Sequence, residues 1–111
     1  MDLDLKGKSV IVTGGGSNIG RAIVLAFAGE GAHITIGDID TVQAGKTADF
    51  ANQLGAASVQ VVKTDVTDLG QVQAMFKAAI DKHGTVDVLV NNVGWDNLMF
   101  FTQTTPEFWR K

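Results

Sequence analysis

The sequence predicts an α/β fold, a doubly wound parallel sheet covered by helices on both faces, on two observations. Short apolar runs rich in β-branched residues alternate along the chain with longer stretches whose apolar residues recur at helical spacing. A glycine-rich segment separates the first run from the first helical stretch, where a strand passes into a helix. The chain has 111 residues, which suits one domain. We expect about four strands, three full helices and the start of a fourth.

The first half of the chain contains two expected strands and two expected helices. Residues 9–13 form an almost continuously apolar run, as a strand that is buried on both faces requires. A helix is expected from Ile19 onward, with an apolar stripe at helical spacing and with Gly31 placed to end it. Residues 33–37 predict the second strand, and residues 41–54 predict an alanine-rich second helix.

The second half repeats this alternation. Residues 58–63 predict a third strand, and Asp68 is placed to cap a helix that Gly84 ends. Residues 86–90 predict a fourth strand, which would form a bare hydrophobic edge of the sheet. The Thr-Pro pair at 105–106 is typical of a helix start, so we expect a fourth helix that continues in a longer protein.

The composition argues against several classes of function. A net charge of −3 and an isoelectric point near 5.1 give no general attraction to nucleic acid or to anionic membranes. No apolar stretch approaches the roughly 18 residues of a membrane span, and the acidic start is unlike a signal peptide. The absence of cysteine excludes disulfides and cysteine-bound zinc. We therefore expect a cytoplasmic protein with no metal site and no nucleic-acid or membrane partner.

The glycine-rich segment after the first strand is the strongest candidate for a binding site. Backbone N–H groups and the positive end of the following helix converge there, which suits a pyrophosphate. Gly14 and Gly20 are expected to give the turn its backbone freedom and to let a ligand approach closely. Ser17, Asn18 and Ile19 lie between them and are expected to contact the same ligand. The alternative is an ordinary strand-to-helix turn that needs flexible residues for its own geometry.

An acidic residue follows the second strand at the distance expected for ribose recognition. Asp38 lies 18 positions beyond Gly20, close to the roughly 20-residue offset at which a carboxylate accepts hydrogen bonds from an adenosine ribose. Its charge would repel a 2′-phosphate, and neither Arg21 nor Arg110 is expected nearby, so NAD is favoured over NADP. Ile39 is expected to line the same site. The alternative for Asp38 is a helix cap, although Asp40 fits that role better.

Two further strand ends fall at the same edge of the predicted sheet, where ligands of open α/β folds bind. Asp65 and Val66 follow the third strand, and the carboxylate could accept a hydrogen bond from the exocyclic amine of adenine. Asn92 and Gly94 follow the fourth strand and could lie beside the riboses. Each of these residues also has a simpler interpretation as a turn former.

Together these motifs resemble the short-chain dehydrogenase/reductase family over nearly the whole chain. The family's motifs are a Thr-Gly-x-x-x-Gly-x-Gly turn, an acidic residue, an Asp-Val pair and an Asn-Asn-Ala-Gly segment, matched at Thr13, Gly14, Gly20, Asp38, Asp65, Val66, Asn91, Asn92 and Gly94. The sequence departs from these motifs at Asn18, where the family has its middle glycine, and at Val93, where alanine is usual.

The resemblance implies that residues 1–111 are the N-terminal part of a single NAD-binding, Rossmann-like domain. It implies hydride transfer between NAD(H) and an alcohol or carbonyl substrate, and a homo-oligomer when the protein is full length. The family's catalytic Ser, Tyr and Lys are not expected in this chain, which contains no tyrosine. In this family the loop after the Asn-Asn-x-Gly segment borders the substrate pocket, and the apolar side chains of residues 95–101 could line a site for a hydrophobic substrate. The Gly-Trp-Asp run at 94–96 is similar to dehydrogenases of alicyclic hydroxyacyl-CoA thioesters. The alternative is that the loop aromatics pack on the following helix or on a partner subunit.

Two alternative functions stay open on the sequence. One is a nucleotide- or S-adenosylmethionine-binding module without redox chemistry, since methyltransferases also place a glycine-rich turn and an acidic residue after their first two strands. The Asn-Asn-Val-Gly segment argues against it. The other is an interaction domain whose turn is damaged at Asn18. The two histidines have simpler interpretations, with His33 in a strand and His83 at a helix C-terminus, where a cation is favoured.

Overall fold

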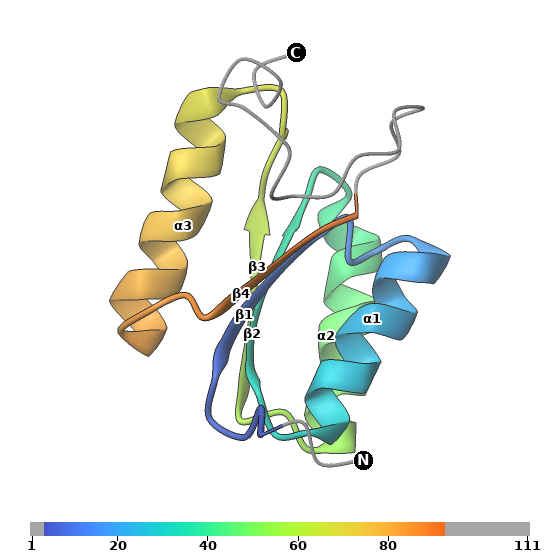
Figure 1. The fold of residues 1–111 in the computed structure, drawn as a ribbon. Coiled ribbons are helices and arrows are strands. Elements are labelled where there is room, and N and C mark those ends of the chain that lie inside the picture. The colour runs from blue at the N-terminus through green and yellow to red at the C-terminus, as the bar shows by residue number, and fades with distance from the viewer. Residues whose placement is uncertain (1–3, 93–111) are drawn as a thin grey trace.

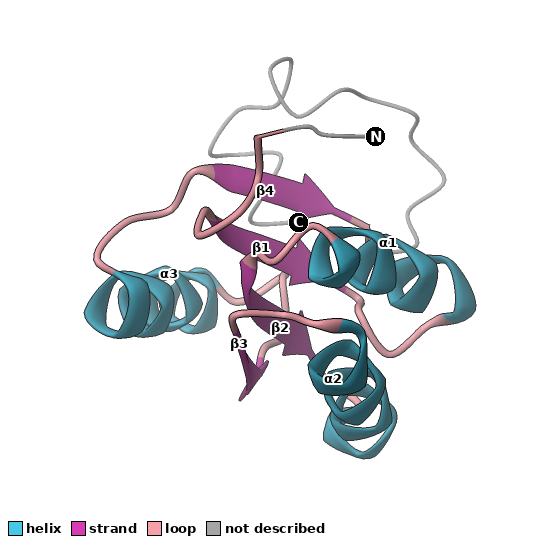
Figure 2. Ribbon diagram, turned by 90° about the horizontal axis from the view of Figure 1, so that it is seen from below, coloured by secondary structure: helices cyan, strands magenta, loops and turns pink. Residues whose placement is uncertain are grey.

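A computed structural model describes residues 4–92, which form a four-stranded parallel sheet with the strand order β3-β2-β1-β4 (Figure 1). Figure 2 shows that α1 and α2 cover one face of the sheet and α3 the other. The predicted α/β, Rossmann-like fold is confirmed, whereas the expected fourth helix lies outside the described residues. In chain order the elements are β1 (Ser9–Thr13), α1 (Asn18–Gly29), β2 (His33–Asp38), α2 (Thr41–Leu54), β3 (Ser58–Lys63), α3 (Leu69–His83) and β4 (Val88–Asn91).

Side chains of β1 alternate between the two faces of the sheet, as the pleat of a strand requires. Val10 and Val12 pack in the cluster formed with α1 and α2, and Ile11 packs with Met75 of α3 in the cluster on the other face. All five β1 residues are buried, which explains the continuous apolar run of that segment. The core therefore lies on both sides of β1 and its neighbour β2.

Most expected boundaries agree with the structure, and the differences occur at the element ends. Helix α1 begins at Asn18 rather than Ile19, because Ser17 is its N-cap. Strand β2 continues through Asp38, since that residue still pairs with Lys63 of β3. Strand β4 begins at Val88 rather than at residue 86, because its pairing with β1 begins there. Helix α3 ends at Gly84 as expected and α2 ends at Gly55, and both glycines are left-handed caps.

Parallel pairing gives the sheet two chemically different edges. The strands end at the carboxyl edge, where α1, α2 and α3 begin, and they start at the opposite amino edge. In the described part of the chain, β4 pairs only with β1, so one side of β4 is an open sheet edge as expected. No helix within residues 4–92 has the length and apolar character needed to span a membrane.

At the amino edge, four polar side chains form a chain of hydrogen bonds. The Ser58 hydroxyl lies 2.8 Å from Nδ1 of His33 and 2.9 Å from Nε2 of His83. The other ring nitrogen of His83 lies 3.3 Å from the hydroxyl of Ser9. Burial, with added repulsion from His33 and Lys82, lowers the pKa of His83. His83 lies in the last turn of α3 beside Lys82, as the sequence predicts for a basic residue, but its surroundings disfavour the charged form of the ring.

Candidate functional site

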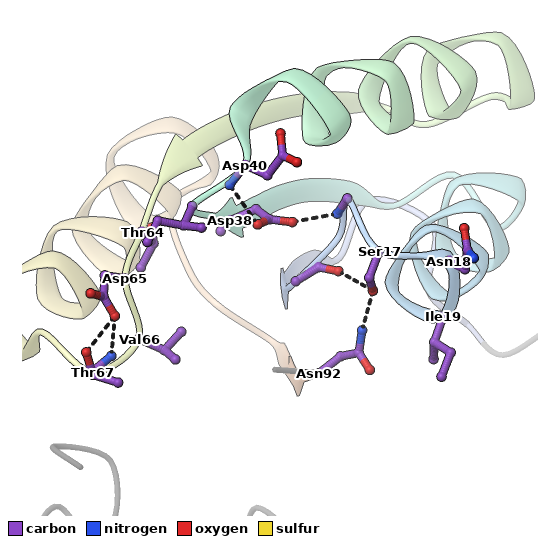
Figure 3. A pocket seen from close by; sticks show the side chains of 14 residues that line it. Ser17, Asn18, Ile19, Asp38, Asp40, Thr64, Asp65, Val66, Thr67 and Asn92 are labelled. Atoms are coloured by element: carbon purple, nitrogen blue, oxygen red, sulfur yellow. Dashed lines mark hydrogen bonds between the residues drawn. The ribbon is translucent and has the colours of Figure 1, made fainter. Parts of the chain in front are cut away.

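A cavity of about 680 Å³ opens at the carboxyl edge of the sheet, between the ends of the strands and the starts of the helices (Figure 3). All of the residues expected at a binding site line it except Gly20, which lies beneath the turn, and Gly94, which lies outside the described residues. Its lining consists of Gly14, Gly16, Ser17, Asn18, Ile19, Gly37, Asp38, Ile39, Asp40, Thr64, Asp65, Val66, Thr67 and Asn92.

The glycine-rich turn is compact because two of its glycines pack directly against backbone. Gly14 adopts a left-handed conformation with φ +67°, and a Cβ there would overlap the backbone carbonyl of Asn92. A Cβ on Gly20 would overlap the carbonyl of Gly14 and lie 2.8 Å from the side-chain nitrogen of Asn92. Gly14 thus supplies the unusual backbone angle, and Gly20 supplies the close approach of helix to turn.

The Ser17 hydroxyl ties three segments of the site together. It donates a hydrogen bond to the carbonyl of Gly14 at 2.8 Å and accepts one from the N–H of Gly20 at 3.0 Å. It also accepts from the side-chain amide of Asn92 at 3.3 Å. Ser17 is therefore the N-cap of α1 and also links the turn to the end of β4 (Figure 3).

Asp38 joins the turn to the start of α2. Its Oδ2 accepts a hydrogen bond from the N–H of Gly16 at 2.8 Å, and its Oδ1 accepts one from the N–H of Asp40 at 3.0 Å. Asp40, and not Asp38, is the N-cap of α2, accepting from the N–H of Gln43. The alternative interpretation of Asp38 as a helix cap is therefore wrong. Asp38 lines the cavity, and a carboxylate oxygen can accept more than one hydrogen bond.

The carboxylate of Asp65 is exposed and held by its own turn. Its Oδ1 accepts from the hydroxyl of Thr67 at 2.6 Å and from the N–H of Thr67 at 2.9 Å. These hydrogen bonds lower the pKa of Asp65, so the carboxylate is ionised at neutral pH. Asp65 therefore forms a turn, as its simpler interpretation predicted, through its Oδ1 atom. The hydrogen bonds of this turn do not involve Oδ2 of Asp65.

The end of β4 is fixed to the end of β1 through Thr13. The Thr13 hydroxyl donates to the side-chain oxygen of Asn91 at 3.0 Å and accepts from the N–H of Asn92 at 2.9 Å. Thr13 is fully buried, so water does not compete for these bonds. These hydrogen bonds hold Asn92 beside the turn. They therefore explain why the backbone of Asn92 leaves no room for a side chain at Gly14.

Asn18 occupies an ordinary helical position. Within residues 4–92, Asp4 is the one non-glycine residue with a positive φ, so Asn18 does not need the left-handed conformation that asparagine tolerates. It is exposed at the first position of α1, where the cavity opens. Ile19 and Ile39 are also exposed, at 69% and 60%, and give this part of the cavity an apolar rim.

Sequence reasoning missed several residues of the cavity, all of which lie within one or two positions of an expected residue. These residues are Gly16, Gly37, Asp40, Thr64 and Thr67. Gly37 is required because a Cβ would meet the sulfur of Met75 on the other face of the sheet. Its place next to Asp38 at a strand end was the one available signal.

The positions of the basic residues around the cavity are relevant to the predicted choice of NAD over NADP. No Lys or Arg is among the residues that line the cavity in the described part of the chain. Lys63 nevertheless pairs in register with Asp38, so a basic residue does lie at this strand end. Arg21 reaches α2, where it donates to Gln43 and lies over the ring of Phe50, with the guanidinium carbon 5.6 Å from the ring centroid. Arg21 is not among the residues that line the cavity, and Arg110 lies outside the described residues.

The groups that line the described part of the site are suited to binding an anion and hydrogen-bond donors. Helix N-termini and glycine N–H groups favour an anion, and carboxylates on two neighbouring strands offer hydrogen-bond acceptors. Among residues 4–92 there is no group of three or more His, Asp or Glu side chains that could hold a metal ion. The described lining contains no histidine, lysine or tyrosine, and its titratable side chains are the carboxylates of Asp38, Asp40 and Asp65.

The amino-acid sequence of the chain is similar to a known protein family and to several characterised proteins. The family model for short chain dehydrogenases matches residues 8–111. The chain is 36% identical over 109 residues to 7alpha-hydroxysteroid dehydrogenase of Escherichia coli, covering 98% of this chain and 42% of that protein. It is 43% identical over 102 residues to glycine betaine reductase ATRR of Emericella nidulans, covering 88% of this chain and 7% of that protein.

A solved structure agrees with these sequence matches. The crystal structure of hydroxysteroid dehydrogenase from Escherichia coli matches with a TM-score of 0.74 and 38% identity, covering 78% of this chain and 35% of that chain. The chain thus spans less than half the length of these relatives.

Proposed function

Because this chain belongs to the short-chain dehydrogenase family, we propose that its cavity binds NAD in an enzyme that transfers hydride between NAD(H) and an alcohol or carbonyl substrate. The observation that carries the proposal is the carboxylate of Asp38, which lies in the cavity and is hydrogen-bonded to the glycine-rich turn. One side chain thereby connects the place for a ribose with the place for a pyrophosphate.

The pyrophosphate belongs above the start of α1. The compact packing of Gly14 and Gly20 brings the backbone of the turn to the cavity without a Cβ in the way. Ser17 and Asn18 lie at the first positions of α1, where the helix dipole and free N–H groups favour negative charge. Ile19 offers an apolar surface beside them.

The adenosine half belongs between the ends of β2 and β3. Asp38 would accept hydrogen bonds from both ribose hydroxyls, and a 2′-phosphate would lose those bonds and meet a like charge. Asp65 has its Oδ2 available for the exocyclic amine of adenine, and Ile39 and Val66 would contact the faces of the ring. Asn92 directly follows β4 and would lie beside the ribose that carries the nicotinamide of NAD. We propose that Gly94, two residues further along the chain, contacts the same part of the cofactor.

When bound, NAD supplies the hydride acceptor, and the residues of this chain bind and orient it. The Ser, Tyr and Lys that supply the proton in this family are not assigned to any residue of this chain, so we assign no catalytic residue here. We further propose a small alcohol or carbonyl substrate, homo-oligomeric assembly and a cytoplasmic location. The named relatives act on different compounds, a 7alpha-hydroxysteroid and glycine betaine, so the choice of substrate stays outside the proposal.

Calorimetric titration of the whole protein with NAD, NADP and S-adenosylmethionine, at one salt concentration, tests the proposal. We expect saturable binding of NAD, at least about tenfold weaker binding of NADP, and no binding of S-adenosylmethionine. Tighter binding of S-adenosylmethionine than of NAD would overturn the proposed redox function. Equal affinities for NAD and NADP would leave the family unchanged and overturn the choice of cofactor.

A further inference from the structure

One peptide group in the glycine-rich turn is held at both of its ends. The peptide that joins Gly15 to Gly16 accepts a hydrogen bond at its carbonyl from the hydroxyl of Thr47, at 2.9 Å. The N–H of the same peptide donates to Oδ2 of Asp38, at 2.8 Å. A rigid planar peptide couples these two contacts, because rotating it to improve one changes the other.

The Thr47 hydroxyl is fully committed to this arrangement. Thr47 lies in α2 and is 0% exposed, so water does not replace its partners. Its single proton can point to the carbonyl of Gly15 at 2.9 Å or to that of Gln43 at 3.3 Å, and the shorter contact is with Gly15. Its lone pair accepts from Nε of Arg21 at 3.0 Å, and this charged donor makes the hydroxyl a stronger donor in turn.

Neighbouring atoms leave this peptide little room but do not set its orientation alone. A Cβ on Gly15 would lie 2.5 Å from Ile36, and one on Gly16 would lie 2.8 Å from Oδ2 of Asp38. Both residues must therefore be glycine, whose backbone otherwise has wide conformational freedom. Hydrogen bonds at the two ends of the peptide are what restrict that freedom.

We propose that Thr47 is a positioning residue for cofactor selectivity, which fixes the Gly15–Gly16 peptide and through it the carboxylate of Asp38. The inference rests on the proposed function, because it assumes that Asp38 binds the ribose. Thr47 itself is not among the residues that line the cavity in the described structure, so its effect is transmitted through the peptide. Loss of its hydroxyl lets the peptide rotate and weakens the contact that orients Oδ2.

Thr47→Val tests this role, since valine keeps the shape of the side chain and removes the hydroxyl. We expect the NAD affinity of the whole protein to fall about three- to tenfold and the NADP affinity to fall less, so that the preference for NAD decreases. In the cofactor-free protein we expect faster hydrogen exchange and a shifted NMR signal for the Gly16 amide. Thr47→Ser retains the hydroxyl and should restore both measurements.

Thr35→Val is the matched control. Thr35 is also fully buried, and its hydroxyl accepts from Gln60 on the face of the sheet covered by α3. A loss of stability alone would be shared by the control and would weaken NAD and NADP equally. An unchanged cofactor preference in Thr47→Val, or a preference that Thr47→Ser does not restore, overturns the inference.

Two further outcomes separate this inference from the proposed function. Failure of the unaltered protein to bind NAD overturns the proposed function, whereas an unchanged Gly16 amide in Thr47→Val overturns the role of Thr47 with or without cofactor. If Thr47→Val does not fold, Arg21→Met takes its place, because it removes the charged donor to Thr47. We then expect a smaller decrease in the preference for NAD and a smaller shift of the Gly16 amide signal. The absence of both changes overturns the inference.

Discussion

The two edges of the sheet use similar polar side chains in different ways. At the amino edge, Ser9, His33, Ser58 and His83 form side-chain hydrogen bonds with one another. At the carboxyl edge, hydroxyls and carboxylates bond mainly to backbone N–H and carbonyl groups of the turns, as Asp38 does with Gly16. Several of these side chains, among them Asp38, Asp65 and Ser17, line the cavity.

This difference indicates that polar side chains at the amino edge stabilise the fold, whereas those at the carboxyl edge prepare the binding site. The side-chain cluster at the amino edge joins β1, β2, β3 and the end of α3 by hydrogen bonds. Polar side chains that hold turns in place prepare backbone and carboxylate groups for a ligand before it arrives. Changes at the carboxyl edge should therefore alter affinity, and changes at the amino edge should alter stability.

Gly20→Ala should have the largest effect on the carboxyl edge. The added Cβ overlaps the carbonyl of Gly14 and crowds Asn92, so the turn must move away from α1. We expect NAD affinity to fall at least about a hundredfold, or about 2.7 kcal/mol, with a loss of about 1–3 kcal/mol in unfolding free energy. Calorimetry and denaturant unfolding measure the two effects.

Gly45→Ala is the control for this substitution. Gly45 lies in α2, and a Cβ there meets nothing within 4 Å. The alanine should stabilise the helix by about 0.5–1 kcal/mol and leave NAD affinity unchanged. Similar affinities for Gly20→Ala and Gly45→Ala would contradict the tight packing of the turn.

Asp38→Ala should have the next largest effect, on the choice of cofactor. Charge-assisted hydrogen bonds contribute about 1.5–3 kcal/mol, so NAD affinity should fall at least about tenfold. NADP affinity should fall less or rise, because the like charge is gone and Lys63 lies at the same strand end. Paired dissociation constants at fixed salt measure the change.

Asp40→Ala separates this effect from simple loss of structure. Asp40 also lines the cavity, and it caps α2, so its removal should cost about 1 kcal/mol of stability. The ratio of NAD to NADP affinity should stay as in the unaltered protein. A ratio that changes as much in Asp40→Ala as in Asp38→Ala would remove the special role of Asp38.

At the amino edge, the effect should be on pH-dependent stability. Burial, His33 and Lys82 lower the pKa of His83, so the unfolded chain binds its proton more readily than the folded protein does. This contribution to stability is complete above about pH 6.5, the usual value for histidine, and is lost as pH falls through the lowered pKa. Thermal melts of the unaltered protein and His83→Gln between pH 5 and pH 8 measure it.

His83→Gln should lose less stability than the unaltered protein on acidification, because the titrating group is absent. Titrating groups that do not contact His83 are shared by both proteins, so their contributions cancel in the difference, which reports on His83 together with the neighbouring His33. NAD affinity at pH 8 should be the same in the two proteins. Melting temperatures that fall in parallel with pH would show that His83 does not contribute.

Asn18→Gly should have the smallest effect. The substitution restores the glycine of the family motif at an exposed helical position, so we expect NAD affinity to rise slightly or stay unchanged. A loss of more than about 1 kcal/mol of binding free energy would show instead that the Asn18 amide donates to the ligand. Calorimetric titration with NAD measures the difference.

The fold could be predicted from the sequence because its signals are local. The continuous apolar run of β1 and the helix ends at Gly55 and Gly84 depend on residues next to each other in the chain. Element ends were less predictable, because pairing with a neighbouring strand decides them. Asp38 and Val88 are examples, since each is in a strand only through its partner.

The candidate site was predictable only where a motif marked it. Asp38 could be found because its offset from Gly20 is characteristic, whereas its hydrogen bond to Gly16 depends on how β2 lies beside the turn. Thr47 had no signal, since a threonine within a helix gives no sign that it meets a distant carbonyl. The lowered pKa of His83 likewise depends on burial against His33, 50 positions away in the chain.

The measurement that tests the difference between the two edges most directly is NMR titration of the whole, nitrogen-15-labelled protein with NAD. We predict saturable shifts of the Gly16 and Gly20 amide signals, which lie at the carboxyl edge, and unchanged amide signals for His33 and His83 at the amino edge. Unchanged glycine signals at saturating NAD, or shifts of equal size at both edges, would contradict the assignment of the cavity as the NAD site.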